Sequence, residues 1–170
     1  MSTTEKVIAH GRTAAIATDE RLEAAGILQK LLTDAIDLAL QAKHAHWNLH
    51  GIQFRSIHHQ LDEVAETARQ FSDRMAERCL ALGAAADGRV ASIAANTSLD
   101  PSPEGRIEDT RVVEHMVERL HAVSEVGRSR LQRLERADPV SQNLVCEFLE
   151  QIEKQLWMFE SSRSNKAPNR

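Results

Sequence analysis

Four long segments whose apolar residues recur at helical spacing constrain the fold of this chain more than any other feature. In a chain of 170 residues they leave room for one domain with a substantial core, and not for two. Aromatic residues make up only 4% of the chain and tyrosine is absent, which favours helix over sheet. The sequence therefore predicts an all-α four-helix bundle, with helices at about 19–47, 56–82, 108–136 and 139–162.

Residues that start and stop helices stand at the boundaries of these segments. Thr18 and Asp19 can cap the first helix, and Gly51 can end it. Gly83 can end the second helix in the same way. Asp138 followed by proline is a strong start signal for the fourth helix, because the acid can cap it and proline suits the first helical position.

The lengths of the connections predict the topology. The first and last connections are short, so the helices that they join are expected to be antiparallel neighbours. The connection over 84–107 can cross the length of the bundle and is expected to carry one short helix at about 90–95. The predicted domain covers 18–162, between a flexible tail at 1–17 and a flexible basic tail at 163–170.

Charge and cysteine content exclude several classes of protein. With 21 basic and 25 acidic residues, the chain is not expected to bind nucleic acid over its whole surface, and any such contact must come from a local patch or a tail. We interpret Cys79 and Cys146, both inside helical segments, as buried thiols rather than as a disulfide or redox pair. No segment has the apolar length of a signal peptide or a membrane span, so a cytoplasmic protein without membrane contact is expected.

The residues that point to chemistry begin with a run of histidines, five of the eight falling within residues 44–59. His58 and Asp62 are four residues apart on the second helix, and so are Asp73 and Glu77. At about 100° per residue, these four positions fit within an arc of roughly 100°. The apolar stripe of the same helix lies well over about 90° from the middle of that arc. One face of the helix therefore builds the core, and another presents histidine and carboxylates.

Distance along the helix decides whether one chain can bind a metal ion with both pairs. About 16 Å of helix separates Asp62 from Asp73, at about 1.5 Å per residue. Metal bonds to nitrogen and oxygen are about 2.0–2.2 Å long, so one chain cannot place both pairs on one ion. A second copy, packed antiparallel about a two-fold axis, brings the histidine end of one helix to the acidic end of the other, twice per dimer. His46, just across a short loop from His58, can join the same cluster.

Such a site holds about two imidazoles and three carboxylates. This mixture suits Fe(II) and also admits zinc or manganese, and it lacks the thiolates that favour copper(I) or an iron–sulfur cluster. Carboxylates also hold iron as it gains charge on oxidation. The alternative is a solvated polar face with acid pairs at four-residue spacing, which many helices carry. Spacing alone leaves both interpretations open.

The same stretch resembles the DNA-protection-during-starvation (Dps) family, the mini-ferritins. The resemblance covers about residues 20–162. Weaker agreement comes from the helix lengths, the middle crossover and the closing segment Leu156-Trp157-Met158-Phe159-Glu160-Ser161. The specific part of the motif runs His46-Trp47-Asn48, Gly51, Phe54, His58-x-x-x-Asp62, Asp73-x-Met75-Ala76-Glu77-Arg78 and Leu82-Gly83.

The resemblance implies a ferritin-like four-helix bundle that assembles into a hollow dodecamer. It implies a ferroxidase that oxidises Fe(II), preferably with hydrogen peroxide, and stores ferric mineral inside the shell. The ferroxidase site of the family lies at the two-fold interface. By this match, His46, His58 and Asp62 are ligands from one subunit, and Asp73 and Glu77 are ligands from the neighbouring subunit.

Other residues near the predicted ligands carry weaker expectations. Trp47 either packs against the site, where it can intercept oxidising equivalents, or is a simple core aromatic. Arg69 and Arg74 lie near the carboxylates and are expected to pair with them when iron is absent. The remaining histidines of the run do not match the ligand set of the family and are expected at the surface or beside the ligands: His44, His50 and His59.

The chain departs from the family pattern in two places. Acids near the start of the fourth helix line the iron-entry pore in the family; Asp138 and Glu147 are available here, but Pro139 and Asn143 stand where further acids would be expected. Many members bind DNA through lysine-rich tails, whereas the tails here carry few charges, which repeated on a shell can still bind a polyanion. These charges are Lys6 and Arg12 against Glu5 at one end, and Arg163, Lys166 and Arg170 at the other.

Three hypotheses for function follow. The leading one is a peroxide-consuming ferroxidase and iron store that protects DNA from oxidative damage. The alternative is an architectural, nucleoid-associated protein that binds DNA through its tails and has a structural or vestigial metal site. The third is a helical scaffold without chemistry, which would bind no metal.

Overall fold

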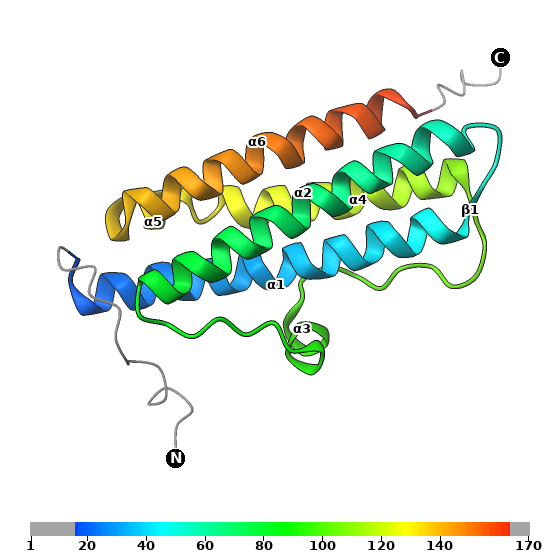
Figure 1. The fold of residues 1–170 in the computed structure, drawn as a ribbon. Helices are drawn as coiled ribbons and strands as arrows, with labels where there is room; N and C mark the ends of the chain where they lie inside the picture. The colour runs from blue at the N-terminus through cyan, green and yellow to red at the C-terminus, as the bar shows by residue number, and fades with distance from the viewer. Residues whose placement is uncertain (1–15, 164–170) are drawn as a thin grey trace.

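The computed structural model describes residues 16–163 of the chain. Its long helices lie side by side as a four-helix bundle (Figure 1). α1 (Thr18–Asn48) and α6 (Pro139–Ser161) run in one direction, and α2 (Phe54–Ala81) and α4 (Asp109–Arg128) run in the other. This confirms the predicted all-α bundle. The tails predicted at the two ends lie largely outside the described residues.

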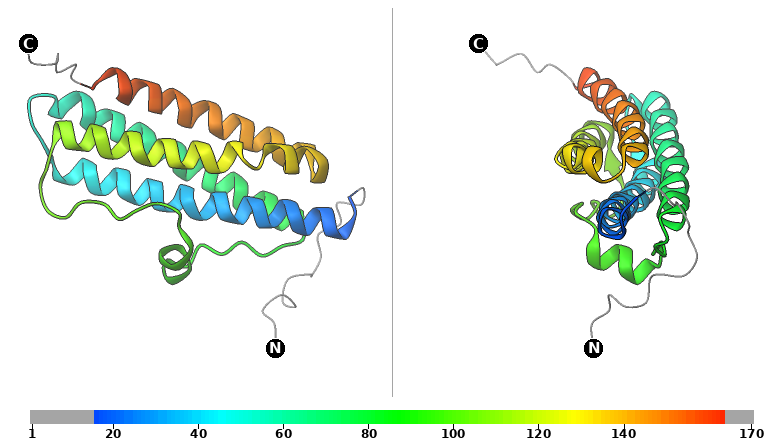
Figure 2. Two further views of the ribbon diagram at one scale, coloured as in Figure 1. Left: turned by 180° about the vertical axis from the view of Figure 1, so that it is seen from behind. Right: turned by 90° about the vertical axis from the view of Figure 1, so that its left-hand side faces the viewer.

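The long connection between α2 and α4 runs along the outside of α1 (Figure 2). It carries the expected short helix, α3 (Val90–Asn96). It ends in β2 (Ile107–Glu108), which pairs in parallel with β1 (Leu49–His50) at the end of α1. Two residues are too few to show an alternating pattern, so the sequence did not reveal this pairing. Asp34 of α1, which is fully buried, holds the connection by accepting hydrogen bonds from the backbone and hydroxyl of Ser98 at 2.8 and 2.7 Å.

A buried polar cluster holds the later part of the crossover against α4. Nε2 of His115 lies 3.4 Å from Oγ of Ser102, and Nε of Arg119 donates to Nδ1 of His115 at 3.4 Å. Arg119 also pairs with Asp100 of the crossover at 3.2 Å. Burial, and then the charge of Arg119, lower the pKa of His115 to about 4. The imidazole is therefore neutral at neutral pH.

Gly83 ends α2 as the sequence predicts, whereas α1 ends at Asn48 with Leu49 as its C-cap, and Gly51 lies further on, after the two residues of β1. Gly51 has a φ of 138° and Gly83 a φ of 85°, a region of backbone conformation that side chains with a Cβ disfavour. After α2, the N–H of Gly83 bonds to the carbonyl of Leu80 at 2.9 Å, and the N–H of Ala84 bonds to that of Cys79 at 2.9 Å. These bonds satisfy carbonyls that a helix end would otherwise leave unpaired.

The start of α1 differs from the prediction that Thr18 or Asp19 caps it. Ala17 stands at the N-cap and contributes no side-chain hydrogen bond. The side chain of Glu20 accepts from the backbone N–H of Ala17 at 3.3 Å instead. An acid in the first turn can therefore close this helix end without a polar cap residue.

The third predicted helix, 108–136, is broken into α4 and α5 (Leu131–Ala137). The N–H of Arg130 bonds to the carbonyl of Gly127 at 3.0 Å, a bond three residues back that tightens the turn and ends α4. Gly127 also lets α6 approach, since a Cβ there would lie 2.6 Å from Cδ2 of Leu149. Apolar residues continue across the break, which is why periodicity did not predict it.

The start of α6 agrees with the prediction from the Asp138–Pro139 pair. The buried carboxylate of Asp138 accepts hydrogen bonds from the backbone of Val140 and of Ser141 at 3.3 and 3.2 Å. Proline occupies the first helical position, where its missing N–H costs nothing.

The four helices share one apolar core, in which Leu28, Leu61, Met116 and Phe148 are fully buried. Cys79 belongs to this core, and burial raises the pKa of its thiol to about 11. Cys146 is exposed, so the prediction of two buried thiols is wrong for this residue; it lies on the outer face of α6, where the apolar pattern of the helix does not reach. Both thiols are free. Within residues 16–163, no helix combines the length and the hydropathy needed to span a bilayer.

Candidate metal centre

His46 and His58 face each other across the short loop that joins α1 to α2. His46 lies near the end of α1 and is buried, and His58 lies near the start of α2 and is half-buried. Their ring centroids are 3.5 Å apart, and the ring planes make an angle of 22°. The ring of Phe54 also stacks on His58, with centroids 4.9 Å apart. The fold therefore brings together two imidazoles from two different helices.

Each imidazole is held by the main chain of the other helix. Nδ1 of His46 lies 3.0 Å from the carbonyl oxygen of His58, and Nδ1 of His58 lies 3.2 Å from the carbonyl oxygen of His46. A carbonyl oxygen only accepts, so both rings carry a proton on Nδ1. In the neutral ring, Nε2 then holds the lone pair that a metal ion needs, and an Nδ1–H bonded to a carbonyl is a common support for a histidine ligand.

Asp62 lies one turn beyond His58 on α2 and reaches the same cluster. Its Oδ1 is 3.2 Å from Nδ1 of His46 and 2.7 Å from Nζ of Lys43. The hydrogen bond from Lys43 lowers the pKa of Asp62 below its ordinary value, so the carboxylate is ionised at neutral pH. The side chain of Asp62 is 49% exposed, which leaves it open to an approaching ion or protein.

Lys43 is the member of this cluster that sequence reasoning missed. It lies on α1 one turn before His46, and its Nζ is also 5.8 Å from the ring centroid of Trp47. A lysine one turn before a histidine is the only sequence signal, and surface helices carry such spacings often. Its ammonium supplies a positive charge to Asp62 within the chain.

Asp73 and Glu77 lie on the exposed face of the second half of α2 and do not join the cluster. Within residues 16–163, neither carboxylate makes an ion pair or a side-chain hydrogen bond. In the same part of the chain, no three His, Cys, Asp or Glu side chains converge where they could hold a metal ion, and this includes His46, His58 and Asp62, because Asp62 lies against Nδ1 of His46 and not against a free Nε2. The histidine half and the acidic half of the predicted site lie apart in one chain, because about 16 Å of rigid helix separates them.

An apolar groove with a volume of about 360 Å³ runs between α1 and α2, with Asp73 on its lining. Leu40 of the groove is 56% exposed, and Trp47, two turns further along α1, is 71% exposed. Apolar side chains exposed together mark surfaces that another molecule covers. We call this surface the α1–α2 face; it comprises Leu32, Ile36, Ala39, Leu40 and Trp47 of α1 with Arg69, Asp73 and Ala76 of α2.

Three expectations about neighbouring residues need correction or refinement. Trp47 is not a core aromatic of this chain, because its side chain lies on the surface beside Lys43. Arg74 pairs with Glu147 of α6 at 2.5 Å and not with the predicted ligands, because α6 packs beside α2 and offers a nearer carboxylate. Arg69 makes no ion pair with any residue that the structure describes.

The other histidines of the run lie around the cluster without joining it. Nε2 of His44 is 2.9 Å from the carbonyl oxygen of Pro103, so this side chain anchors the crossover. His50 belongs to β1, and His59 is exposed, with its ring centroid 6.0 Å from that of His58.

The two acids expected near an iron-entry pore are both engaged. Asp138 is 1% exposed and forms an ion pair with Arg78 at 2.6 Å in addition to capping α6. Glu147 is bound to Arg74. One carboxylate is thus bound at a helix end and the other by an arginine within the single chain, and the place of these acids at a pore between copies stays a prediction.

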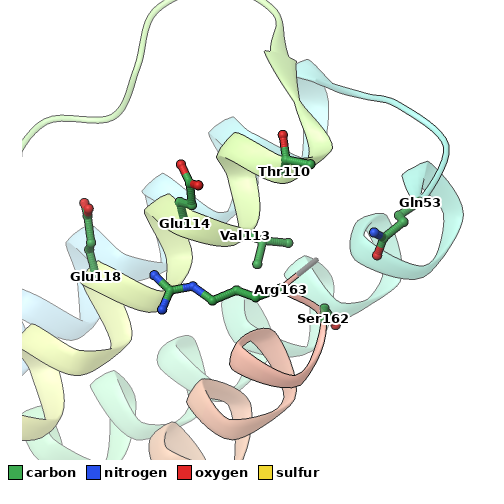
Figure 3. A pocket seen from close by; sticks show the side chains of 7 residues that line it. All are labelled: Gln53, Thr110, Val113, Glu114, Glu118, Ser162 and Arg163. Carbon is green, nitrogen blue, oxygen red and sulfur yellow. The ribbon is translucent and has the colours of Figure 1, made fainter. Parts of the chain in front are cut away.

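A separate pocket of about 340 Å³ lies at one end of the bundle, between α4 and the end of α6 (Figure 3). In this view the side chain of Arg163 extends along α4 toward Glu118. No predicted metal ligand lines the pocket, so it is distinct from the candidate metal centre. Its lining residues are Gln53, Thr110, Val113, Glu114, Glu118, Ser162 and Arg163.

Comparison with known proteins decides the family. Residues 25–165 match the ferritin-like domain family. The chain is also 31% identical over 143 residues to the DNA protection during starvation protein of Agrobacterium fabrum, a match that covers 84% of this chain and 88% of that protein. The chain belongs to the Dps family. The resemblance stated from the motif is thereby confirmed, and so is the ferritin-like fold.

The chain is also similar to two further Dps proteins. It is 32% identical over 151 residues to DNA protection during starvation protein 2 of Deinococcus radiodurans, a match that covers 89% of this chain but 63% of that relative. The chain thus spans less than two thirds of the length of this longer Dps protein. The solved structure of Dps from Microbacterium arborescens in the high iron form has a TM-score of 0.80 at 29% identity, over 84% of this chain and 93% of that one.

Proposed function

We propose that this Dps-family protein is a ferroxidase and iron store whose metal sites are each completed by two copies of the chain. The observation that carries the proposal is the cluster of His46, His58 and Asp62, which offers two Nε2 atoms and one ionised carboxylate and is incomplete within one chain. Nitrogen and oxygen ligands of this kind suit Fe(II), and zinc or manganese can substitute for it.

The missing ligands would come from Asp73 and Glu77 of a second copy. Both carboxylates are exposed, and Asp73 borders the apolar groove of the α1–α2 face. Antiparallel packing of two α2 helices about a two-fold axis carries each acidic end to the histidine end of the other copy. The same contact would cover Leu40 and Trp47, whose exposure is costly in a monomer. Family membership extends the proposal to a hollow dodecamer.

Iron is the substrate of this site. When Fe(II) binds, Asp62 exchanges its ion pair with Lys43 for the charge of the metal, and the carboxylates stabilise the ion as its charge rises. Two Fe(II) ions each give one electron to one hydrogen peroxide, whose O–O bond breaks; with two protons it leaves as two waters. Peroxide is thus consumed in the two-electron reaction, the ferric product is stored as mineral in the shell, and nearby DNA is spared oxidative damage.

The direct test combines three substitutions, His46→Ala, His58→Ala and Asp62→Ala. We expect the triple variant to lose rapid iron oxidation, with and without hydrogen peroxide, while size-exclusion chromatography gives the wild-type assembly. His59→Ala is the matched control, because it removes an exposed imidazole next to His58. Oxidation by the triple variant at the wild-type rate would refute the site.

DNA binding is the second candidate activity, since the related proteins of Agrobacterium fabrum and Deinococcus radiodurans are named for DNA protection. Most tail charges lie outside the described residues. An architectural, nucleoid-associated protein in the cytoplasm would retard DNA in a salt-sensitive way that disappears on removal of residues 163–170, and would oxidise little iron with peroxide. Iron oxidation without DNA retardation instead supports the ferroxidase as the main activity.

A further inference from the structure

The loop between the two histidines is short, so its conformation determines how the two imidazoles meet. α1 ends at Asn48 and α2 begins at Phe54, and each histidine lies within about one turn of that loop. The rings are bonded to each other's carbonyl groups, so a small shift of one helix end relative to the other would break both contacts.

Asp109, the first residue of α4, contacts this loop from the far end of the crossover. Its side chain is 6% exposed. Oδ2 accepts a hydrogen bond from the backbone N–H of Gln53 at 2.8 Å, and Oδ1 accepts from the N–H of Thr110 at 2.8 Å. Gln53 is the N-cap residue of α2, so the carboxylate closes the loop at the point where α2 begins and lies at the positive end of that helix.

The loop backbone lies directly against the same carboxylate. A Cβ on Gly51 would be 2.2 Å from Oδ2 of Asp109, closer than any side chain can approach. The pairing of β1 with β2, which places Leu49 opposite Ile107 and His50 opposite Glu108, delivers Asp109 to this position. The hydrogen bond to Gln53 therefore ties the loop to the start of α4, and Gly51 leaves the space that the same oxygen atom occupies.

We infer that Asp109 is a positioning residue for the metal centre: by clamping residues 51–53 it sets the alignment of His46 and His58 that leaves Nε2 of both rings free for the ion. The inference rests on the proposed function. It adds a residue from α4, an element that supplies no predicted ligand, to the groups on which metal binding depends.

Co(II) binding to the full-length assembled protein tests this role, because the visible spectrum of Co(II) reports its ligands without any turnover. We expect Asp109→Ala to weaken Co(II) affinity about tenfold and to change the spectrum, as loss of a residue that orients ligands does. Asp109→Asn keeps one carbonyl acceptor for Gln53 and should bind within about threefold of wild type. Glu108→Ala, which removes an exposed carboxylate one residue earlier, is the control and should bind as wild type does.

The outcomes separate this inference from the proposed function. Wild-type affinity and spectrum in Asp109→Ala, or equal losses in the alanine and asparagine variants, would overturn the role of Asp109 alone. If Asp109→Ala does not assemble, Gly51→Ala is tested instead, because this variant keeps the carboxylate of Asp109 but pushes a methyl group against it. If neither variant assembles, Asp109 is a folding residue and the inference is overturned. If His58→Ala binds Co(II) as wild type does, the proposed function itself is wrong, and the inference with it.

Discussion

Nζ of Lys43 lies 2.7 Å from Oδ1 of Asp62, across the junction of α1 and α2. The same oxygen atom is 3.2 Å from Nδ1 of His46. A cation of the chain itself therefore occupies the carboxylate that a metal ion would use, and the side chain of this lysine is 19% exposed. A metal ion that takes Oδ1 of Asp62 would displace Lys43, which makes Lys43 a competitor of the ion for this atom.

Substitution of Lys43 by glutamine should strengthen the binding of divalent metal. An ion pair with one half-exposed partner contributes about 0.2–1 kcal/mol, so its loss should tighten the dissociation constant for Zn(II) by about 1.5- to 5-fold. Titration calorimetry on the assembled protein measures this change, and Lys154→Gln, an exposed lysine on α6, is the control. Weaker binding in Lys43→Gln would mean that the lysine assists the metal and does not compete with it.

The buried ion pair between Arg78 and Asp138 should matter far more to stability than the exposed pair between Arg74 and Glu147. Burial alone would raise the pKa of Asp138, but hydrogen bonds from Ser141 and Arg78 bring it below its ordinary value. Arg78→Ala leaves that buried carboxylate without its cation and should cost about 3 kcal/mol or more. Arg74→Ala breaks a pair in which both side chains are 44% exposed and screened by water, so it should destabilise the protein far less. Urea unfolding of both variants measures the change in the free energy of unfolding. Equal changes in the two variants would contradict the expectation that the buried pair matters more.

His115 should make the protein less stable as the pH falls from 6.5 toward about 4. Its pKa is lower in the folded protein than in the unfolded chain, so the unfolded chain binds the extra proton in this window, and the stability that is fully present above pH 6.5 is lost on acidification. The titratable and charged groups around it are His44 of α1, Asp100 of the crossover, and Arg111 and Arg119 of α4.

The measurement for this prediction is urea unfolding at several pH values and one protein concentration. His115→Gln should lose less stability than wild type between pH 6.5 and 4.5, because glutamine does not titrate. His121→Gln, which removes an exposed imidazole from the same helix, should follow the wild-type curve. Parallel curves for wild type and His115→Gln would show that this imidazole is not the group responsible.

Two glycines inside helices should respond to alanine in opposite directions. At Gly26 of α1 no atom lies within 4 Å of an added Cβ, so Gly26→Ala should stabilise by up to about 1 kcal/mol through helix propensity. At Gly127 the added Cβ would meet Leu149 at 2.6 Å, so Gly127→Ala should destabilise by about 1–3 kcal/mol as α6 is pushed away. Thermal unfolding checks both; stabilisation by Gly127→Ala would mean that Leu149 moves aside without cost.

Much of the fold could be read from local features. Gly83 ends α2 as predicted because a residue without Cβ easily adopts a positive φ. Asp138 caps α6 because its carboxylate lies within reach of the backbone N–H groups that follow it. The prediction that Gly51 ends α1 is wrong, because α1 passes at Leu49 into β1, whose pairing with a distant strand the local pattern does not contain. The break between α4 and α5 escaped prediction because the apolar pattern of the chain continues through it. The approach of α6 at Gly127 is a contact between distant segments, which no local pattern records.

The candidate site, too, has a part that the sequence predicts and a part that depends on tertiary packing. The sequence predicts that Arg69 and Arg74 hold the ligand carboxylates in the metal-free chain, whereas in the structure Lys43 pairs with Asp62 and Arg74 pairs with Glu147. The choice among these cations depends on which helices pack together and which carboxylate is nearest, and spacing along one helix contains neither.

The sequence by itself determined the four long helical segments, apart from the break between α4 and α5. It also determined the separation of the histidine end of α2 from its acidic end, because the rise and turn of an α-helix are the same wherever the helix lies. Only the tertiary structure decided that Lys43 would occupy Asp62 and that Asp109 would close the loop beside His46 and His58. These contacts join residues from different helices, and their partners are selected by the packing of the whole bundle.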